Sequence, residues 1–240
     1  MASPRRALRH SDRGEVVAAV ATRLIARLVE FQEAGHAPQL ALSGDPVSHS
    51  VLKAVLSRSP GSRLQPARLG LWWTDDAFLP TQSRERHSQR ALSLLGGLHL
   101  DPALIHPVPS SDAYADPEAA AQAYAAELGS TRLDICLLEL GQLGQVAGIF
   151  PGQRPADDPV VGVTGAPDGP ADRVSLGLAT INDSREVWVL ACGHSVAGLV
   201  AASFAGAPSL PGARVSGRER TWWFLDQPAA SLLPFHSCEL

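Results

Sequence analysis

The sequence predicts an α/β protein built on an open, mostly parallel sheet with helices on both faces. Short apolar runs of strand length recur along the chain, at 39–42, 69–73 and 187–191. Stretches with a helical spacing of apolar residues, such as 12–34 and 118–128, separate them. Strand and helix patterns that alternate in this way indicate parallel strands joined by crossover helices.

Length and composition favour one large domain. The chain has 240 residues, of which 45% are hydrophobic and 18% charged, and its net charge is −4. We expect a disordered tail at 1–10 and a single domain over 11–240, because no linker or internal repeat interrupts the pattern. A slightly acidic chain gives no electrostatic reason to bind nucleic acid.

The sequence also disfavours membrane insertion and export. No stretch approaches about 18 uninterrupted apolar residues, and no apolar segment follows the basic start of the chain. Cys136, Cys192 and Cys238 are too scattered for a disulfide framework or a zinc site. We therefore expect a cytoplasmic protein with reduced thiols and no contact with a membrane.

The first elements along the chain are a helix and a short strand. Ser11 or Asp12 can cap a helix whose apolar positions keep helical spacing until Gly35. The strand 39–42 then leads into the loop Ser-Gly-Asp-Pro at 43–46, and a second helix follows. The aspartate adds negative charge to this loop and the proline removes an amide donor, so the loop disfavours an anion.

Acidic residues follow the next strand, 69–73. Asp75 and Asp76 come at its end, and His87 follows in the same connection. Carboxylates and an imidazole at one strand end are groups that can act as a general base. The charges at 84–86 are interpreted as a solvated helix face.

The stretch 133–152 organises the chain. It reads LDICLLELGQLGQVAGIFPG, an apolar strand that stops at a loop containing Gly141 and Gly144 and is expected to restart as a short helix. Glycines let the backbone approach a ligand closely, and a helix N-terminus favours an anion. This arrangement is typical of sites for sugar phosphates in open α/β sheets.

The same stretch resembles the signature of the 6-phosphogluconolactonases. Their loop reads roughly Gly-Met-Gly-x-Asp-Gly-His-Thr-Ala-Ser-Leu-Phe-Pro-Gly, which aligns with Glu139 to Gly152. The family's acid falls on Leu143, and its catalytic histidine falls on Gln145. The related glucosamine-6-phosphate deaminases continue into Phe-Asn-Glu-Pro-Gly, whereas this chain keeps the lactonase form Phe-Pro-Gly at 150–152.

Further motifs extend the resemblance over about residues 14–235. Ser43 and Gly44 match the family loop Leu-Ser-Gly-Gly-Ser-Thr-Pro, and Asp45 stands at its next glycine. Asp75 and Asp76 match the two acids of Trp-x-Asp-Glu-Arg.

Two of the family's three cationic positions are replaced. The arginine of Trp-x-Asp-Glu-Arg falls on Ala77, and the lysine of a later Gly-x-x-Lys-Ala motif falls on Val196. Arg173 is the cationic position that this chain keeps.

The resemblance implies lactone hydrolysis in the oxidative pentose phosphate pathway, without metal or organic cofactor. The family histidine takes a proton from water that attacks the lactone, and the cations hold the phosphate or stabilise the oxyanion. Uncharged residues replace the histidine, the acid, one arginine and the lysine here. We therefore interpret the chain as a lactonase-like protein with a degraded site, which binds a sugar phosphate, a sugar lactone or another protein of the pathway. The alternative is an active lactone hydrolase with a relocated base.

The candidate residues follow from these motifs. The catalytic candidates are Gln145, at the histidine position, and Asp75, Asp76 and His87 as a replacement base. The substrate-binding candidates are Ser43, Gly44, Asp45, Gly141, Gly144, Arg173 and His194. No spacing of His, Cys, Asp and Glu matches a metal motif, so we expect no metal site.

Overall fold

The computed structural model describes residues 3–152 and 158–234, and it confirms the α/β fold. Seven strands form the main sheet in the order β1-β10-β9-β6-β2-β3-β5, and every neighbouring pair runs parallel. In that order the strands are Arg5–His10, Arg220–Asp226, Glu186–Ala191, Ile135–Glu139, Gln39–Leu42, Gly70–Trp73 and Ile105–His106. β6, β2 and β9 occupy the middle of the sheet and are almost entirely buried.

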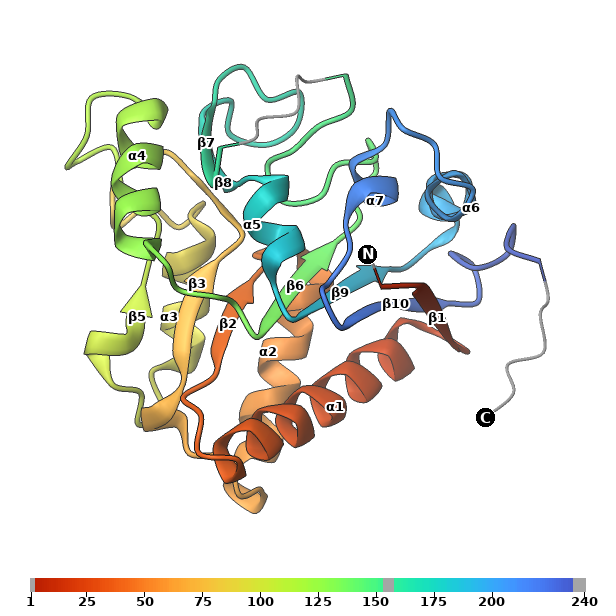
Figure 1. Ribbon diagram of the computed structural model, residues 1–240, viewed down its shortest axis with the longest axis horizontal. Helices are drawn as coiled ribbons and strands as arrows, with labels where there is room; N and C mark the ends of the chain where they lie inside the picture. The colour runs from red at the N-terminus through yellow and green to blue at the C-terminus, as the bar shows by residue number, and fades with distance from the viewer. Residues whose placement is uncertain (1–2, 153–157, 235–240) are drawn as a thin grey trace.

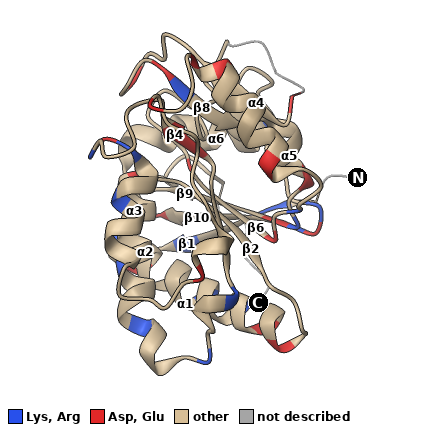
Figure 2. Ribbon diagram, turned by 90° about the vertical axis from the view of Figure 1, so that its left-hand side faces the viewer, with Lys and Arg blue, Asp and Glu red and all other residues tan. Residues whose placement is uncertain are grey.

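Helices cover both faces of this sheet (Figure 1). They are α1 Arg13–Glu33, α2 Pro46–Arg58, α3 His87–Leu95, α4 Pro117–Leu128, α5 Leu178–Asp183, α6 Ala197–Phe204 and α7 Pro211–Arg214. Figure 2 shows α1, α2 and α3 on one side of the strands and α4 and α5 on the other. The predicted cap of α1 is confirmed, because the Asp12 carboxylate accepts a hydrogen bond from the Glu15 amide at 2.9 Å.

A second, antiparallel sheet has the strand order β4-β8-β7. β4 (Asp75–Ala77) follows β3 directly, and its partners are β8 (Arg173–Leu176) and β7 (Val160–Val163). The sequence analysis did not predict this sheet. It positions the site, because it carries the two aspartates of β4 beyond the carboxyl end of β3 and places β8 against them.

The expectation of a disordered tail at 1–10 is wrong for residues 5–10. These residues form β1, which pairs in register with β10 from Arg5 opposite Thr221 to His10 opposite Asp226. The Arg5 guanidinium donates hydrogen bonds to the carbonyls of Ser203 and Ala213. Residues 1–2 lie outside the described residues.

A further expectation, about the glycine loop, is wrong. The short helix expected after the glycine loop is absent, because residues 141–152 form turns and two isolated bridges, Leu140 with Val146 and Val146 with Ile149.

Cys238 lies outside the described residues, whereas Cys136 and Cys192 are free thiols. Within 3–152 and 158–234, no helix has the length and apolar content needed to cross a bilayer.

Deleting residues 1–10 is expected to destabilise the protein by at least about 2 kcal/mol, because it removes a whole edge strand and the partly buried side chains of Ala7 and Leu8. Urea unfolding followed by circular dichroism measures this change. An unchanged free energy of unfolding would mean that the segment behaves as a tail.

Candidate active site

Two consecutive aspartates of β4 form the centre of the candidate site. Successive side chains of a strand point to opposite faces. Asp75 accordingly pairs with Arg173 of β8, while Asp76 accepts a hydrogen bond from the backbone amide of His87 at the start of α3. Both carboxylates are almost completely shielded from solvent, with exposed fractions of 1% and 0%. A buried charge of this kind requires partners.

Asp76 is saturated with hydrogen-bond donors. Its oxygens accept from the backbone amides of Ala77, His87 and Ser88 at 2.9, 2.6 and 3.1 Å. The Ser88 hydroxyl lies at 2.5 Å, and the Arg86 guanidinium forms an ion pair at 3.2 Å. Asp76 therefore anchors the N-terminus of α3 and has no oxygen free to accept a proton from water.

The interpretation of 84–86 as a solvated helix face is wrong for Arg86. This side chain is 2% exposed, pairs with Asp76 and also donates to the carbonyl of Val108. The sequence analysis missed it because a run of charges is most often solvated. The signal that could have identified it is its position just before His87, at a helix start that faces two acids.

His87 lies against Asp75 and is charged at neutral pH. Its Nδ1 is 3.7 Å from Asp75 Oδ1 and 3.3 Å from the Asp75 carbonyl oxygen. Burial alone would lower the pKa of His87, but Asp75, followed by Asp76 and Asp45, outweighs burial and raises the pKa to about 9. The imidazole therefore carries its proton near pH 7.

Asp75 is paired on its other oxygen with Arg173. The guanidinium donates to Asp75 Oδ2 at 2.8 Å and to the Pro170 carbonyl at 3.3 Å. Burial alone would raise the pKa of Asp75, yet His87 and Arg173 together lower it. Arg173 is thus held in an ion pair inside the protein, and a ligand would have to share it with Asp75.

The loop after β2 reaches the same cluster. Gly44 leaves room for the His87 ring, because a Cβ at this position would lie 2.0 Å from its Cγ. The Ser43 hydroxyl donates to Asp45 Oδ2 at 2.6 Å. Burial and the nearby Asp75 raise the pKa of Asp45, although His87 acts in the opposite direction. The structure thus brings Ser43, Gly44 and Asp45 next to the two acids and the histidine.

Glu139, at the end of β6, is a site residue that sequence reasoning missed. Its Oε2 accepts hydrogen bonds from the amides of Val47 and Ser48 at 2.9 and 3.2 Å. Burial, followed by the charge of Asp45, raises the pKa of Glu139 to about 8. The available signal was an acid at the first glycine of the family signature.

The glycine loop folds back on itself. A Cβ at Gly141 would lie 2.1 Å from the Gln145 side chain, so glycine is needed there for this side chain to fit. The Gln145 side-chain oxygen accepts from the Leu143 amide at 3.0 Å. Gly148, in the same loop, approaches β8 and accepts no side chain, because its Cβ would lie 2.8 Å from that of Ser175.

No contact joins the remaining candidates, Gly144 and His194, to the cluster within the described residues. Gly144 has a positive φ of 83° and approaches Leu199 and Leu210. His194 is exposed in a short 3-10 turn, and within the described part of the chain it makes no hydrogen bond to Asp45, Asp75 or His87. Ala77 and Val196, which the resemblance aligns with two cationic positions, are buried apolar side chains at 1% and 3% exposure.

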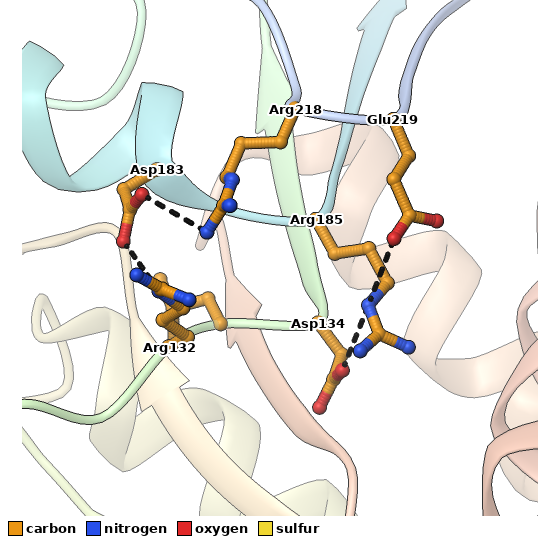
Figure 3. Close-up of a pocket in the computed structure, with 7 residues that line it drawn as sticks. Arg132, Asp134, Asp183, Arg185, Arg218 and Glu219 are labelled. Atoms are coloured by element: carbon orange, nitrogen blue, oxygen red, sulfur yellow. Dashed lines mark hydrogen bonds and ion pairs between the residues drawn. The ribbon is translucent and has the colours of Figure 1, made fainter.

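A separate hollow lies at the opposite, amino-terminal edge of the main sheet (Figure 3). Arg132 and Arg218 both pair with Asp183, at 3.1 and 3.4 Å, and Arg185 lies between Asp134 and Glu219. These residues precede β6, β9 and β10, whereas the aspartates and His87 follow strand ends. We place the candidate active site at the carboxyl ends because buried groups with shifted pKa values gather there.

Comparison with known proteins gives the family. The family model described as glucosamine-6-phosphate isomerases/6-phosphogluconolactonase matches residues 11–223. The chain belongs to this family. It is 37% identical to a 6-phosphogluconolactonase of Streptomyces coelicolor, over 94% of this chain and 93% of that protein. It is 31% identical to one of Mycobacterium tuberculosis, over 93% and 96%.

Solved structures of the family share the fold. The 6-phosphogluconolactonase from Trypanosoma cruzi superposes with a TM-score of 0.84 at 19% identity, covering 98% of this chain and 99% of that one. A monomeric glucosamine-6-phosphate deaminase gives 0.80 at 18% identity, covering 95% and 99%. The shared fold is therefore consistent with either a lactonase or a deaminase.

Asp76→Asn is expected to lower the free energy of unfolding by about 3–5 kcal/mol, because the variant leaves the buried Arg86 guanidinium without a counter-charge. Urea unfolding measures the loss. The exposed neighbour variant Glu85→Gln serves as the control and is expected to stay within about 0.5 kcal/mol of the unmodified protein. A loss of similar size in both variants would contradict the role given to Asp76.

The pH dependence of stability is expected to report on His87. Its pKa is about 9 in the folded protein against 6.5 for the free side chain, so its contribution is complete below about pH 6.5 and is lost as the pH rises through about 9. Urea unfolding between these limits is expected to give a falling free energy, with a slope reduced in His87→Asn by up to about 1.4 kcal/mol per pH unit. His194→Asn, which alters an exposed histidine, is expected to keep the original slope.

Proposed function

We propose that this family member binds a sugar phosphate or sugar lactone between the glycine loop, β4 and the β2–α2 loop, and hydrolyses 6-phosphogluconolactone slowly or not at all. The observation that carries the proposal is Gln145. It occupies the position of the family histidine, and its oxygen is hydrogen bonded within its own loop. An amide cannot take a proton from water near neutral pH, and loss of a general base costs about 10²- to 10⁴-fold in rate.

The groups proposed as a replacement base are poorly suited to that role. His87 is protonated and lies against Asp75, so it has no free lone pair to accept a proton near pH 7. Asp76 has donors on both oxygens, and Asp75 is paired with Arg173. Proton transfer needs a group that is both accessible and unprotonated.

Phosphate binding is weakened in the same region. Ala77 and Val196 replace an arginine and a lysine of the family pattern, and each lost charge-assisted hydrogen bond costs about 1.5–3 kcal/mol. Arg173 is retained but already forms an ion pair with Asp75. These features support a binding role over efficient turnover of a phosphorylated lactone.

A second candidate function is an active lactonase that uses a carboxylate base. Asp45 favours it, because this side chain is only partly exposed to solvent and burial, together with Asp75, raises its pKa above the usual value of an aspartate. A carboxylate with a raised pKa is a stronger base than an ordinary one. We propose that either function belongs to the cytoplasm and to the pentose phosphate pathway, and relatives that bear the name 6-phosphogluconolactonase support the pathway.

Lactone hydrolysis by the purified protein tests the proposal. 6-Phosphogluconolactone is generated in place, and its spontaneous opening is subtracted. We expect the unmodified protein to stay near background and Gln145→His to raise the rate if the rest of the site still accepts the substrate. Gln142→His, in the same loop, is the matched control and is expected to stay at background.

Turnover well above background by the unmodified protein would overturn the proposal. Its loss in Asp45→Asn would then assign the base of the second candidate function to Asp45. A background rate in all variants, together with binding of 6-phosphogluconate measured by calorimetry, would support the binding role. No binding and no turnover would overturn both candidate functions.

A further inference from the structure

The N-terminus of α2 has its backbone donors satisfied from within the protein. Pro46 is the first helical residue and has no N–H. The amides of Val47 and Ser48 donate to Glu139, and the amide of His49 donates to the Asp45 carbonyl at 2.9 Å. Free N–H groups at a helix start are the donors that bind phosphate in many α/β proteins. Here no such donor is left.

Glu139, not the capping residue of α2, supplies the side-chain oxygen that accepts hydrogen bonds from the start of this helix. Asp45 is the N-cap, yet its side chain makes no capping hydrogen bond and accepts from Ser43 instead. Glu139 comes from the end of β6, far along the chain, at a position that is glycine in the family signature. A glycine there leaves the two amides open, whereas the glutamate fills the space and accepts from both.

A second observation points to an anion-binding geometry at the same turn. The hydroxyl of Ser48 is buried, and in the part of the chain that the structure describes it has no hydrogen-bond partner. This hydroxyl does not bond to Glu139, although the amide of the same residue does, so one buried donor of the turn is left unsatisfied. An unsatisfied buried donor requires a partner that the described residues do not supply here.

We propose that Glu139 is a specificity-determining residue that occupies the place of an anionic ligand group, so that the site disfavours a phosphorylated sugar relative to the same sugar without phosphate. This inference rests on the proposed sugar-binding function. A phosphate reaches these amides only by displacing the Glu139 carboxyl. Asp45, beside it, adds repulsion that Arg173 and His87 only partly offset.

The charge on Glu139 depends on pH, and several groups face it. Asp45 of the β2–α2 loop, Arg13 of α1 and Cys192 after β9 act on or near this carboxyl, and His87 and Arg173 act on Asp45. With a pKa of about 8, the Glu139 carboxyl is largely neutral at pH 7 and largely ionised at pH 9. At pH 7 the site therefore disfavours phosphate because the Glu139 carboxyl already occupies the two amides. At pH 9 the negative charge of that carboxyl adds repulsion.

Calorimetry with a matched pair of ligands tests the proposal. 1,5-Anhydroglucitol and its 6-phosphate share the ring and differ only in the phosphate, and neither can be hydrolysed. We expect Glu139→Ala to raise the preference for the phosphorylated ligand by about tenfold or more at both pH values, because it frees two amides. Glu139→Gln keeps an oxygen that accepts from the amides but removes the charge. Its preference for the phosphorylated ligand is therefore expected to rise at pH 9, where Glu139 is ionised, and not at pH 7.

Glu118→Gln is the control, because Glu118 also lies in the first turn of a helix, α4, but is exposed and outside the site. Its ligand preference is expected to equal that of the unmodified protein. Circular dichroism and thermal unfolding establish that each variant is folded, and Glu139→Gln preserves the shape of the side chain if Glu139→Ala fails to fold.

The outcomes separate this inference from the proposed function. Binding of both ligands with a preference that neither Glu139 variant changes would overturn the role of Glu139 and leave the sugar-binding function in place. Binding of neither ligand by any folded variant would overturn both. A preference that rises equally in the Glu118 control would assign the effect to net charge and also overturn the proposal.

Discussion

The arrangement of the site depends on how two neighbouring buried carboxylates are neutralised. Asp75 and Asp76 stand side by side on β4 and must point to opposite faces of that short strand. An unpaired charge in either place would cost several kcal/mol. Asp76 therefore requires Arg86 and the first amides of α3, and Asp75 requires Arg173 and His87. These contacts join α3, the antiparallel sheet and the carboxyl edge of the main sheet.

This network also determines the chemistry that is available. The imidazole of His87 is held as a cation between acids, so it acts as a counter-charge and not as a base near neutral pH. Its ring fills the space over Gly44, which couples the β2–α2 loop to β4. The carboxyls whose pKa values are raised are then those of Asp45 and of Glu139, the latter to about 8. Both stand where the family signature has glycine.

Much of the fold could be predicted from the sequence, because apolar periodicity and capping residues act locally. The strand 39–42 and the helix capped by Asp12 follow from such signals. β1 could not be predicted, because its arginines leave no apolar strand pattern and its partner strand, β10, lies at the other end of the chain. The roles of Arg86 and Glu139 were missed although each had a weak local signal, because the partners that define these roles lie on other elements.

The positions at which this chain departs from the family pattern bear on one property, the number of groups left free to bind an anion. A site that awaits an anion keeps cations and backbone donors unsatisfied until the ligand arrives, and this costs stability in the free protein. Ala77 and Val196 are buried apolar side chains where the resemblance places cations, and Glu139 accepts hydrogen bonds from the amides of α2. Arg173, which matches a cationic position of the family, is paired with Asp75. Under the proposed function, these features leave few groups free for an anionic ligand. Under the proposed function, a sugar that binds at this carboxyl edge contacts the protein chiefly through its hydroxyl groups and ring, because the cation and the amides already have partners within the fold.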